Sequence, residues 1–265
     1  IILGAILIDF IFGWPNIFNK KIGHPVSWIG KLINLQDIIL NQESYSYKIR
    51  KFNGFLVLLS CLLLISSIVL AIEFFIKELY YGIIILIVVT WPFLAIKSME
   101  DHIKEIILNL KNKDLTLSRK SVAKIVGRDT SALNQRKLVI ASLESLGENT
   151  SDGIIGPIFW GLLLGLPGII IYKTVNTLDS MIGYKSEKYK DFGYASAKMD
   201  DLLNLVPSRI TGLLFAIVSK NVFNTLKIMI KDGSKHASPN SGYPEAALAG
   251  ALNVRISGPR YYKKI

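Results

Sequence analysis

Apolar residues along this chain gather into runs long enough to cross a lipid bilayer. The clearest run covers 53–72 and contains no charged residue, and a second run covers 79–96. Each meets the requirement of about 18–20 apolar residues for a hydrocarbon core of roughly 30 Å. The pattern therefore predicts two membrane-spanning helices joined by the short polar turn between them.

Three further apolar runs, at 1–13, 154–172 and 202–219, are less regular. The first contains Asp9 but lacks the basic n-region and small-residue cleavage site of a signal peptide, so we expect a span. The second is interrupted by a Gly-Leu-Pro-Gly sequence, and the third contains a proline and Arg209. Such interruptions are typical of broken or half-inserted membrane helices.

We therefore expect an all-α polytopic membrane helix bundle with about four to five hydrophobic segments, the late ones broken or re-entrant. The chain is predicted to form a single membrane-embedded domain over 1–265. Segment 98–120 has apolar residues at helical spacing with charges opposite, which predicts an amphipathic helix on the membrane or covering the bundle. The polar segments are 14–52, 98–153, 173–201 and 220–265.

Composition and charge agree with this class. The chain is 51% hydrophobic with a formal charge of +11, and its mean hydropathy is +0.39. Basic residues flank the 53–96 hairpin on both sides while its turn is net acidic, so both flanks are predicted to be cytoplasmic. No nucleic-acid-binding motif accompanies the charge. The single cysteine, Cys61, excludes an intrachain disulfide and a cysteine-based metal cluster.

Counting spans strictly places 173–201 on the opposite side of the membrane from 98–153, although both segments are rich in polar residues. We expect the sequence at 165–168 to break the fourth segment, so that one or both late segments re-enter without crossing. The chain has no initiator Met and ends on a basic run at 261–264, and we expect it to be part of a longer protein.

Acidic residues concentrate just before the fourth segment. On a continuous helix Glu144, Glu148 and Asp152 would lie on one face, where three like charges repel unless they are solvated or bound to a cation. A hard ion such as Mg²⁺ prefers carboxylate oxygens, and Asn149 supplies a neutral oxygen nearby. A solvated acidic face is the alternative interpretation.

A second cluster begins the 202–219 segment. On a helix Asp200, Asn204 and Ser208 share a face, and Arg209 follows inside the apolar run. A charged side chain at that depth indicates a functional site. A structural ion pair within the bundle is the alternative.

Two loops complete the candidate chemistry. The 238–242 loop precedes a helix expected to begin at Pro244, and amide groups at such a start bind phosphate or carboxylate. The small residues from 246 to 250 favour close helix packing. His24 lies in a short loop before Pro25, where a structural hydrogen bond is the more common role of a lone histidine.

Taken together, these residues resemble the adenosylcobinamide-phosphate synthase family of cobalamin biosynthesis. Seven blocks in family order carry the resemblance over nearly the whole chain. Trp14 replaces an expected acidic residue, which argues against metal binding by that loop, and Lys198 replaces an expected arginine. The blocks are Asp9 with Gly13 and Pro15; 24–26 with Gly30; 127–130; Glu144 with 148–153; 176–181; Asp200 and Asp201 with Asn204 and 207–209; and 238–242 with 244–246 and 249–251.

The resemblance implies an ATP-dependent ligase that joins a carboxylate of adenosylcobyric acid to (R)-1-aminopropan-2-ol or its O-phosphate, giving adenosylcobinamide or its phosphate. It implies ATP and the corrinoid as substrates and Mg²⁺ on the nucleotide. Metal binding is assigned to Glu144, Glu148, Asp152, Asp179 and Asp201, and catalysis to Glu148, Asp152, Asp179, Asp200 and Asp201. Substrate or phosphate binding is assigned to His24, Arg128, Asp129, Asn149, Asn176, Asn204, Arg209, Ser238, Asn240, Ser241, Gly242 and Glu245.

The resemblance also places the protein in the cell membrane, with membrane lipid around it and its active site on the cytoplasmic side. Other corrin-pathway membrane enzymes or a second copy of the chain are its expected protein partners. Two other functions stay open: a transporter of a small anionic or corrinoid solute, which broken helices also suit, and a membrane signalling or scaffold protein.

Overall fold

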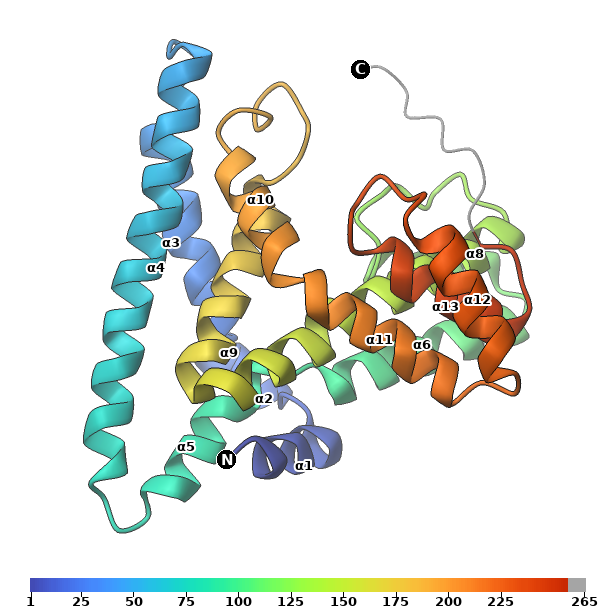
Figure 1. Ribbon diagram of the computed structural model, residues 1–265, viewed down its shortest axis with the longest axis horizontal. Helices are drawn as coiled ribbons and strands as arrows, with labels where there is room; N and C mark the ends of the chain where they lie inside the picture. The colour runs from blue at the N-terminus through green and yellow to red at the C-terminus, as the bar shows by residue number, and fades with distance from the viewer. Residues whose placement is uncertain (257–265) are drawn as a thin grey trace. The chain divides into compact units, whose positions relative to one another are not determined.

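The computed structural model describes residues 1–256, and the basic run at 261–264 falls outside them. Within 1–256 the fold is entirely helical, as predicted (Figure 1). The elements are α1 (Ile2–Phe12), α2 (Asn16–Lys21), α3 (Pro25–Leu40), α4 (Tyr47–Lys77), α5 (Gly82–Thr90), the 3₁₀-helix η1 (Trp91–Phe93), α6 (Ile96–Lys111), α7 (Leu115–Ala123), α8 (Gln135–Thr150), the π-helix η2 (Ser151–Ile155), α9 (Gly156–Ile182), α10 (Tyr194–Leu203), α11 (Leu205–Ile217), α12 (Val222–Gly233) and α13 (Gly242–Leu252).

The chain divides into two compact units, each built from two separate stretches of sequence. Unit 1 contains Ile1–Lys97 and Gly156–Asn204, and unit 2 contains Ser98–Ile155 and Leu205–Ile265. The apolar helices α4 and α9 belong to unit 1, whereas most of the charged candidate site belongs to unit 2. The single-domain organisation over 1–265 stays a prediction.

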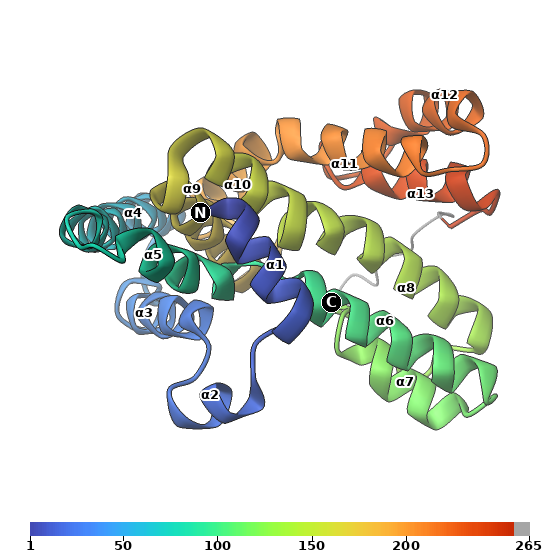
Figure 2. The ribbon, with the colours of Figure 1, turned by 90° about the horizontal axis from the view of Figure 1, so that it is seen from below.

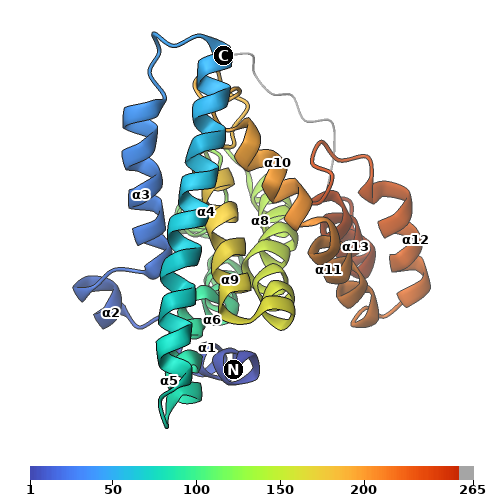
Figure 3. The same cartoon turned by 60° about the vertical axis from the view of Figure 1, so that its left-hand side comes forward.

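Unit 1 is built around α4 and α9, with α3 packed against both (Figure 3). Its core includes the fully buried Ile33, Val57 and Leu178. Gly54 of α4 lies directly against the carbonyl of Phe192, where a side chain would collide with backbone. Close packing at this glycine therefore holds the 183–193 loop against α4.

The apolar runs form helices that suit a bilayer. By length and composition, three helical stretches of the described residues are able to cross a membrane, Tyr47–Lys77, Gly82–Lys111 and Gln135–Ile182. A fourth span results if α1 and the following Asn16–Leu40, bent by 93°, count as one. Only 22% of the apolar window of α4 is buried, so lipid must cover the remainder. The protein is therefore a membrane protein.

The predicted break in the fourth apolar segment is confirmed. Gly165 has φ 68° and ψ −150°, which interrupts α9. A side chain on Gly168 would collide with the Trp160 carbonyl, and one on Gly156 would collide with the Tyr172 ring. The chain thus folds back on itself at Gly165, between the helix that continues from α8 through η2 and the second part of α9, 166–182. Re-entry without crossing stays a prediction, because the helical stretch Gln135–Ile182 is long and apolar enough to cross a membrane.

Two other predicted spans are shorter or less continuous than expected. The 79–96 run is interrupted by η1, which contains Pro92 and follows the end of α5. Proline has no backbone N–H and therefore cannot continue the hydrogen bonds of the helix. The 202–219 run yields α11, an apolar helix of 13 residues. At 1.5 Å per residue it measures about 20 Å, less than the hydrocarbon thickness.

Unit 2 contains two groups of helices. Ile106, Val122, Leu138 and Ala141 form the core shared by α6, α7 and α8, and α13 packs against α11 and α12 (Figure 2). The predicted helix over 98–120 is instead two helices. Lys113 adopts a left-handed conformation with φ 57°, and Asp114 then caps α7 by accepting a hydrogen bond from the Leu117 N–H.

Candidate functional site

The carboxylates predicted before the fourth apolar segment lie where α8 ends. Asn134 caps the start of α8 by accepting a hydrogen bond from the Lys137 N–H at 3.0 Å. Glu144 and Glu148 are one turn apart on this helix, but Asp152 lies in the π-helical turn η2. The prediction of one continuous α-helical face is therefore wrong for Asp152, because the wider π turn changes the residue spacing. Such turns occur frequently at functional sites.

Two of the predicted site residues in unit 2 form an ion pair. Arg128 Nη2 lies 3.1 Å from Glu144 Oε2, with 49% of the arginine side chain exposed and 14% of the glutamate. The pair places a guanidinium beside the first of the three carboxylates, which reduces the repulsion between the acidic residues. To bind a phosphate, Arg128 would have to break its ion pair with Glu144 or keep it while also contacting the phosphate.

The 238–242 loop is ordered by its first serine. Ser238 Oγ accepts hydrogen bonds from the backbone N–H groups of Asn240 and Ser241, at 3.2 and 3.3 Å. Ser241 Oγ in turn donates to Glu148 Oε1 at 3.3 Å. The helix that follows begins at Gly242, two residues before the predicted start at Pro244. The loop therefore meets the carboxylate end of α8.

Arg209 fastens the same loop to α11. Its Nη1 donates to the Leu205 carbonyl at 2.7 Å, to Ser208 Oγ at 3.1 Å and to Asn240 Oδ1 at 3.2 Å. The guanidinium also lies over the Tyr243 ring, 4.1 Å from its centre. These contacts make Arg209 a positioning residue for the loop. The prediction that it also binds phosphate stays a prediction.

A glycine allows α8 and α13 to approach closely. A Cβ on Gly147 would lie 3.3 Å from the Cα and N atoms of Glu245, so a larger residue would push the helices apart. Glu245 is 3% exposed, and its Oε1 lies 3.6 Å from His236 Nε2. Unit 2 thereby brings Glu148 of α8 close to Ser241 and the first turn of α13, which contains Glu245, so that two segments distant in sequence meet.

Unit 1 holds a second network of predicted residues. Asn176 Nδ2 lies 3.4 Å and Asn204 Nδ2 3.0 Å from the Asp200 carboxylate. Tyr172, which the sequence did not single out, donates to Asn204 Oδ1 at 2.7 Å. The shared face of Asp200 and Asn204 is confirmed. Ser208 does not continue it, because α10 ends at Leu203 and Ser208 belongs to α11.

The neighbouring carboxylates of Asp200 and Asp201 occupy different environments. Asp200 is buried, whereas Asp201 is partly exposed and lies 3.1 Å from Lys198 Nζ. The hydrogen bond to Asp201 raises the pKa of Lys198 above its ordinary value. Asp179 is near the end of α9, where its backbone carbonyl accepts the Gly183 N–H at 2.7 Å. Its predicted role and that of Asp201 stay predictions.

Three of the predicted binding residues have local structural roles. His24 Nδ1 accepts the Val26 N–H at 3.2 Å and caps α3. Asp129 accepts hydrogen bonds from the backbone N–H and the hydroxyl of Ser131, which hold its pKa below the usual value. Asn149 Nδ2 contacts the Ile125 carbonyl at 3.4 Å. Such contacts explain these residues without a ligand, and their assignment to substrate binding stays a prediction.

The predicted metal ligands are divided between the units, with Glu144, Glu148 and Asp152 in unit 2 and Asp179 and Asp201 in unit 1. Among residues 1–256, no three His, Cys, Asp or Glu side chains are arranged to hold a metal ion. Mg²⁺ bound to a nucleotide needs only one or two carboxylates besides the phosphates and water. The assignment of these five carboxylates to metal binding stays a prediction.

Comparisons with known proteins agree with the sequence blocks. The family model described as CobD/Cbib protein matches residues 2–265. "Cobalamin biosynthesis protein CobD" of Rhodobacter capsulatus is 47% identical over 258 residues, covering 97% of this chain and 81% of the relative. The protein of the same name from Clostridium tetani is 37% identical over 266 residues, covering 98% and 83%.

A third relative with this name, from a Sinorhizobium species, is 39% identical over 269 residues, covering 97% of this chain and 82% of its own length. No solved structure is significantly similar to the chain. The match extends through both units, including the α8 carboxylates and the loop before α13. The chain therefore belongs to the CobD/Cbib protein family and has a role in cobalamin biosynthesis.

Proposed function

We propose that the chain is an adenosylcobinamide-phosphate synthase, an acid–amine ligase of the cell membrane. It joins a carboxylate of adenosylcobyric acid to (R)-1-aminopropan-2-ol or its O-phosphate with consumption of ATP. The observation that carries the proposal is the meeting of α8 with the 238–242 loop, where Ser241 contacts Glu148 and Arg209 holds Asn240. Acidic, hydroxyl and cationic groups from three segments are thus assembled in one unit.

These groups suit a reaction through an acyl phosphate. A carboxylate is a poor acyl donor, so one of its oxygens first takes the γ-phosphoryl group of ATP and ADP leaves. The amine nitrogen then attacks the carbonyl carbon, phosphate leaves, and the nitrogen loses a proton to a base. Phosphoryl transfer relies mainly on positioning and on charge stabilisation by cationic groups and Mg²⁺.

Each group has a proposed role in this sequence. Arg128 and the 238–242 loop orient phosphate, and Arg209 keeps the loop in place. Glu148 and Asp152 would hold a nucleotide-bound Mg²⁺, which would supply charge neutralisation at the transferring phosphoryl group. The catalytic roles of Asp179, Asp200 and Asp201, which belong to unit 1, stay predictions. The site faces the cytoplasm, where ATP is available.

Substitution of single carboxylates tests the proposal. We expect Asp152→Asn and Asp201→Asn in purified, lipid-reconstituted protein to lower cobinamide formation by about 100-fold, the scale of losing one charge-stabilising group. Glu105→Gln and Glu187→Gln are matched controls, since both glutamates form exposed ion pairs. Near wild-type product formation by a variant removes that residue from the site.

The fold-back in α9 favours one second candidate, a transporter, because broken helices also line transport pathways. A transporter predicts solute flux across proteoliposomes. The ligase predicts consumption of ATP with formation of an amide and no flux. Measuring both in the same preparation separates the two functions.

A further inference from the structure

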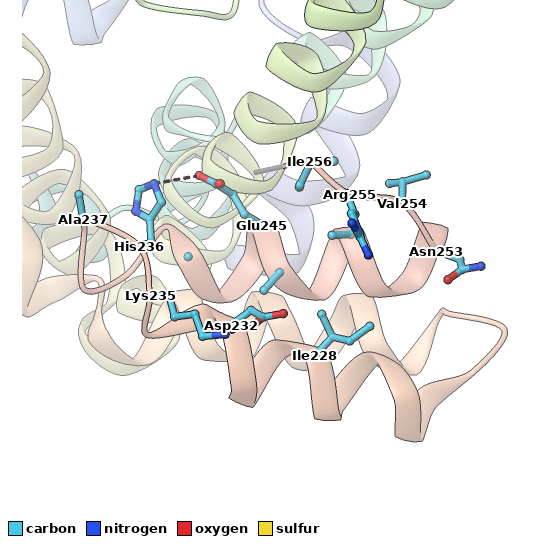
Figure 4. A pocket seen from close by; sticks show the side chains of 13 residues that line it. Ile228, Asp232, Lys235, His236, Ala237, Glu245, Asn253, Val254, Arg255 and Ile256 are labelled. Carbon is cyan, nitrogen blue, oxygen red and sulfur yellow. Dashed lines mark hydrogen bonds and ion pairs between the residues drawn. The ribbon is translucent and has the colours of Figure 1, made fainter. Parts of the chain in front are cut away.

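A cavity of about 800 Å³ lies in unit 2, bounded by α12, α13 and the backbone on either side of α13 (Figure 4). We call it the α12–α13 cavity. Its volume is within the range of about 300–1,000 Å³ common for small-molecule sites. Gly242 and Glu245 are among the residues that the sequence predicts to bind substrate, and Ala246 and Ala249 are among the small residues that it predicts to pack closely.

The cavity exists because one face of α13 carries small side chains. Gly242, Ala246 and Ala249 all line it, at the helical spacing that places them on one face. Close packing also involves small residues of α13, since Ala247 is fully buried, a side chain on Gly242 would collide with the Gly233 carbonyl and one on Gly250 would approach Thr225 to 3.1 Å. The open space therefore lies beside Ala246 and Ala249, and Gly242 lines the cavity from a close-packed position.

One end of the cavity is built to receive a cation. His236 Nδ1 accepts the Ser238 N–H at 3.0 Å, so the neutral ring carries its proton on Nε2. This nitrogen faces the Glu245 carboxylate at 3.6 Å, which is almost fully buried. Asp232 adds a second carboxylate to the wall, paired with Lys235 at 2.5 Å. A buried carboxylate beside a hydrogen-bonding ring suits an ammonium or a hydroxyl group.

The other end is built to receive an anion. Arg255 lines the cavity beyond the end of α13, whereas Glu245 belongs to the first turn of that helix (Figure 4). An arginine offers a planar set of donors that matches phosphate oxygens. The walls between the two ends include apolar side chains such as Ile228 and Val254. The cavity therefore presents Glu245 and the Asp232–Lys235 ion pair at one end, an apolar middle, and Arg255 at the other end.

We infer that the α12–α13 cavity is the binding site for the amine substrate, a short amino alcohol or its phosphate ester. The ammonium and hydroxyl groups lie toward Glu245, His236 and Asp232, and a phosphate ester lies toward Arg255. The inference rests on the proposed function for the identity of the amine. The cavity is larger than such a molecule, which leaves room for the carboxylate arm of the second substrate to reach it.

Two variants test the site without disturbing the core. Ala249→Leu fills the cavity from a partly exposed position, and Arg255→Gln removes the positive end at an exposed position. Lys231→Gln is the matched control, because Lys231 is an exposed cation of α12 that does not line the cavity. The probes are 1-aminopropan-2-ol, its O-phosphate and inorganic phosphate, titrated calorimetrically into the reconstituted full chain without ATP or corrinoid.

We expect the phosphorylated amine to bind more tightly than either fragment. Ala249→Leu should raise the Kd of both amines at least 10-fold, and Arg255→Gln should raise that of the phosphorylated amine alone by a similar factor. Lys231→Gln should leave both values unchanged. Wild-type Kd values in folded Ala249→Leu protein, or displacement of the amine by ADP, would overturn the inference.

The same variants separate this inference from the proposed function. Amine binding that depends on Ala249 and Arg255 without any cobinamide formation would reject the ligase and retain the site. Cobinamide formation with an amine KM unaffected by Ala249→Leu would retain the ligase and reject the site. The KM for ATP is expected to stay at the wild-type value in both variants.

Discussion

The two units use buried carboxylates in different ways. In unit 1, Asp37 accepts hydrogen bonds from Asn41 at 2.8 Å, Tyr189 at 3.0 Å and Lys188 at 3.1 Å. These contacts tie the 183–193 loop to α3. In unit 2, Glu245 pairs with His236 at the wall of a cavity large enough for a ligand. A buried carboxylate thus connects a loop to a helix in unit 1, whereas in unit 2 a buried carboxylate lines a cavity that we infer to bind the amine.

The comparison teaches that burial alone does not identify a functional carboxylate. Asp9 is as buried as Glu245, yet it accepts the Ile96 N–H at 2.7 Å and serves α6. The two carboxylates differ in their surroundings, because Glu245 also lines a cavity. A cavity with a few polar groups in its wall is the usual form of a small-molecule site.

The largest expected effect is loss of activity in unit 2. Glu148→Gln keeps the shape of the side chain but removes the charge beside Ser241, so we expect product formation to fall by about 100-fold. The thermal midpoint should stay close to wild type. Steady-state turnover and thermal unfolding in the same detergent measure the two properties. Equal losses of stability and activity would make Glu148 a structural residue like Asp37.

The largest expected effect on stability is in unit 1. Gly54→Ala places a methyl group against the Phe192 carbonyl, and relieving this overlap should cost about 1–3 kcal/mol. Thermal unfolding of purified protein measures the shift. Gly127→Ala is the control, because a Cβ there meets no atom within 4 Å. An unchanged midpoint for Gly54→Ala would show that the loop does not need this close contact.

A smaller loss of stability is expected from Asp37→Asn. The amide weakens the charge-assisted contacts to Lys188 and Tyr189, but Lys188 is half exposed and water screens the pair. We therefore expect a loss of about 1 kcal/mol. Turnover per folded molecule should remain at the wild-type level. A large fall in turnover with an unchanged midpoint would place Asp37 among the functional carboxylates instead.

The smallest expected effect concerns a surface pair of unit 2. Lys104 Nζ lies 2.6 Å from Glu100, one helical turn away on α6, and 64% of the lysine side chain is exposed. Lys104→Gln should change the free energy of unfolding by less than about 0.5 kcal/mol. The measurement is thermal unfolding at low and high salt. A larger, salt-dependent loss would show that α6 relies on this pair.

Much of the fold is predictable from local signals. The uninterrupted apolar run at 53–72 lies inside α4, and the Gly165 break appears where a glycine and a proline interrupt the fourth segment. Boundaries were less predictable, because single residues determine them. The single helix predicted over 98–120 is divided just before Asp114, which caps the start of α7. The π turn at η2 moves Asp152 away from the helix face predicted for Glu144 and Glu148. Neither feature alters the hydrophobic pattern.

The candidate site was predictable as a set of residues and not as an arrangement. The polar blocks identified Glu148, Ser241 and Asn240, but their meeting depends on tertiary packing that no local pattern records. His236 and Arg255 were missed for the same reason, since a single histidine and a single arginine carry no spacing signal. The inferred role of both residues rests on the cavity that they line.

The proposed ligation is tested most directly by turnover of the purified chain with adenosylcobyric acid, Mg²⁺-ATP and each form of the amine, followed by mass spectrometry of the corrinoid and assay of ADP. We expect one ADP and one phosphate for each cobinamide or cobinamide phosphate formed, with product absent when any substrate is omitted. Unchanged adenosylcobyric acid in the presence of active, folded protein and all three substrates would contradict the proposed ligation.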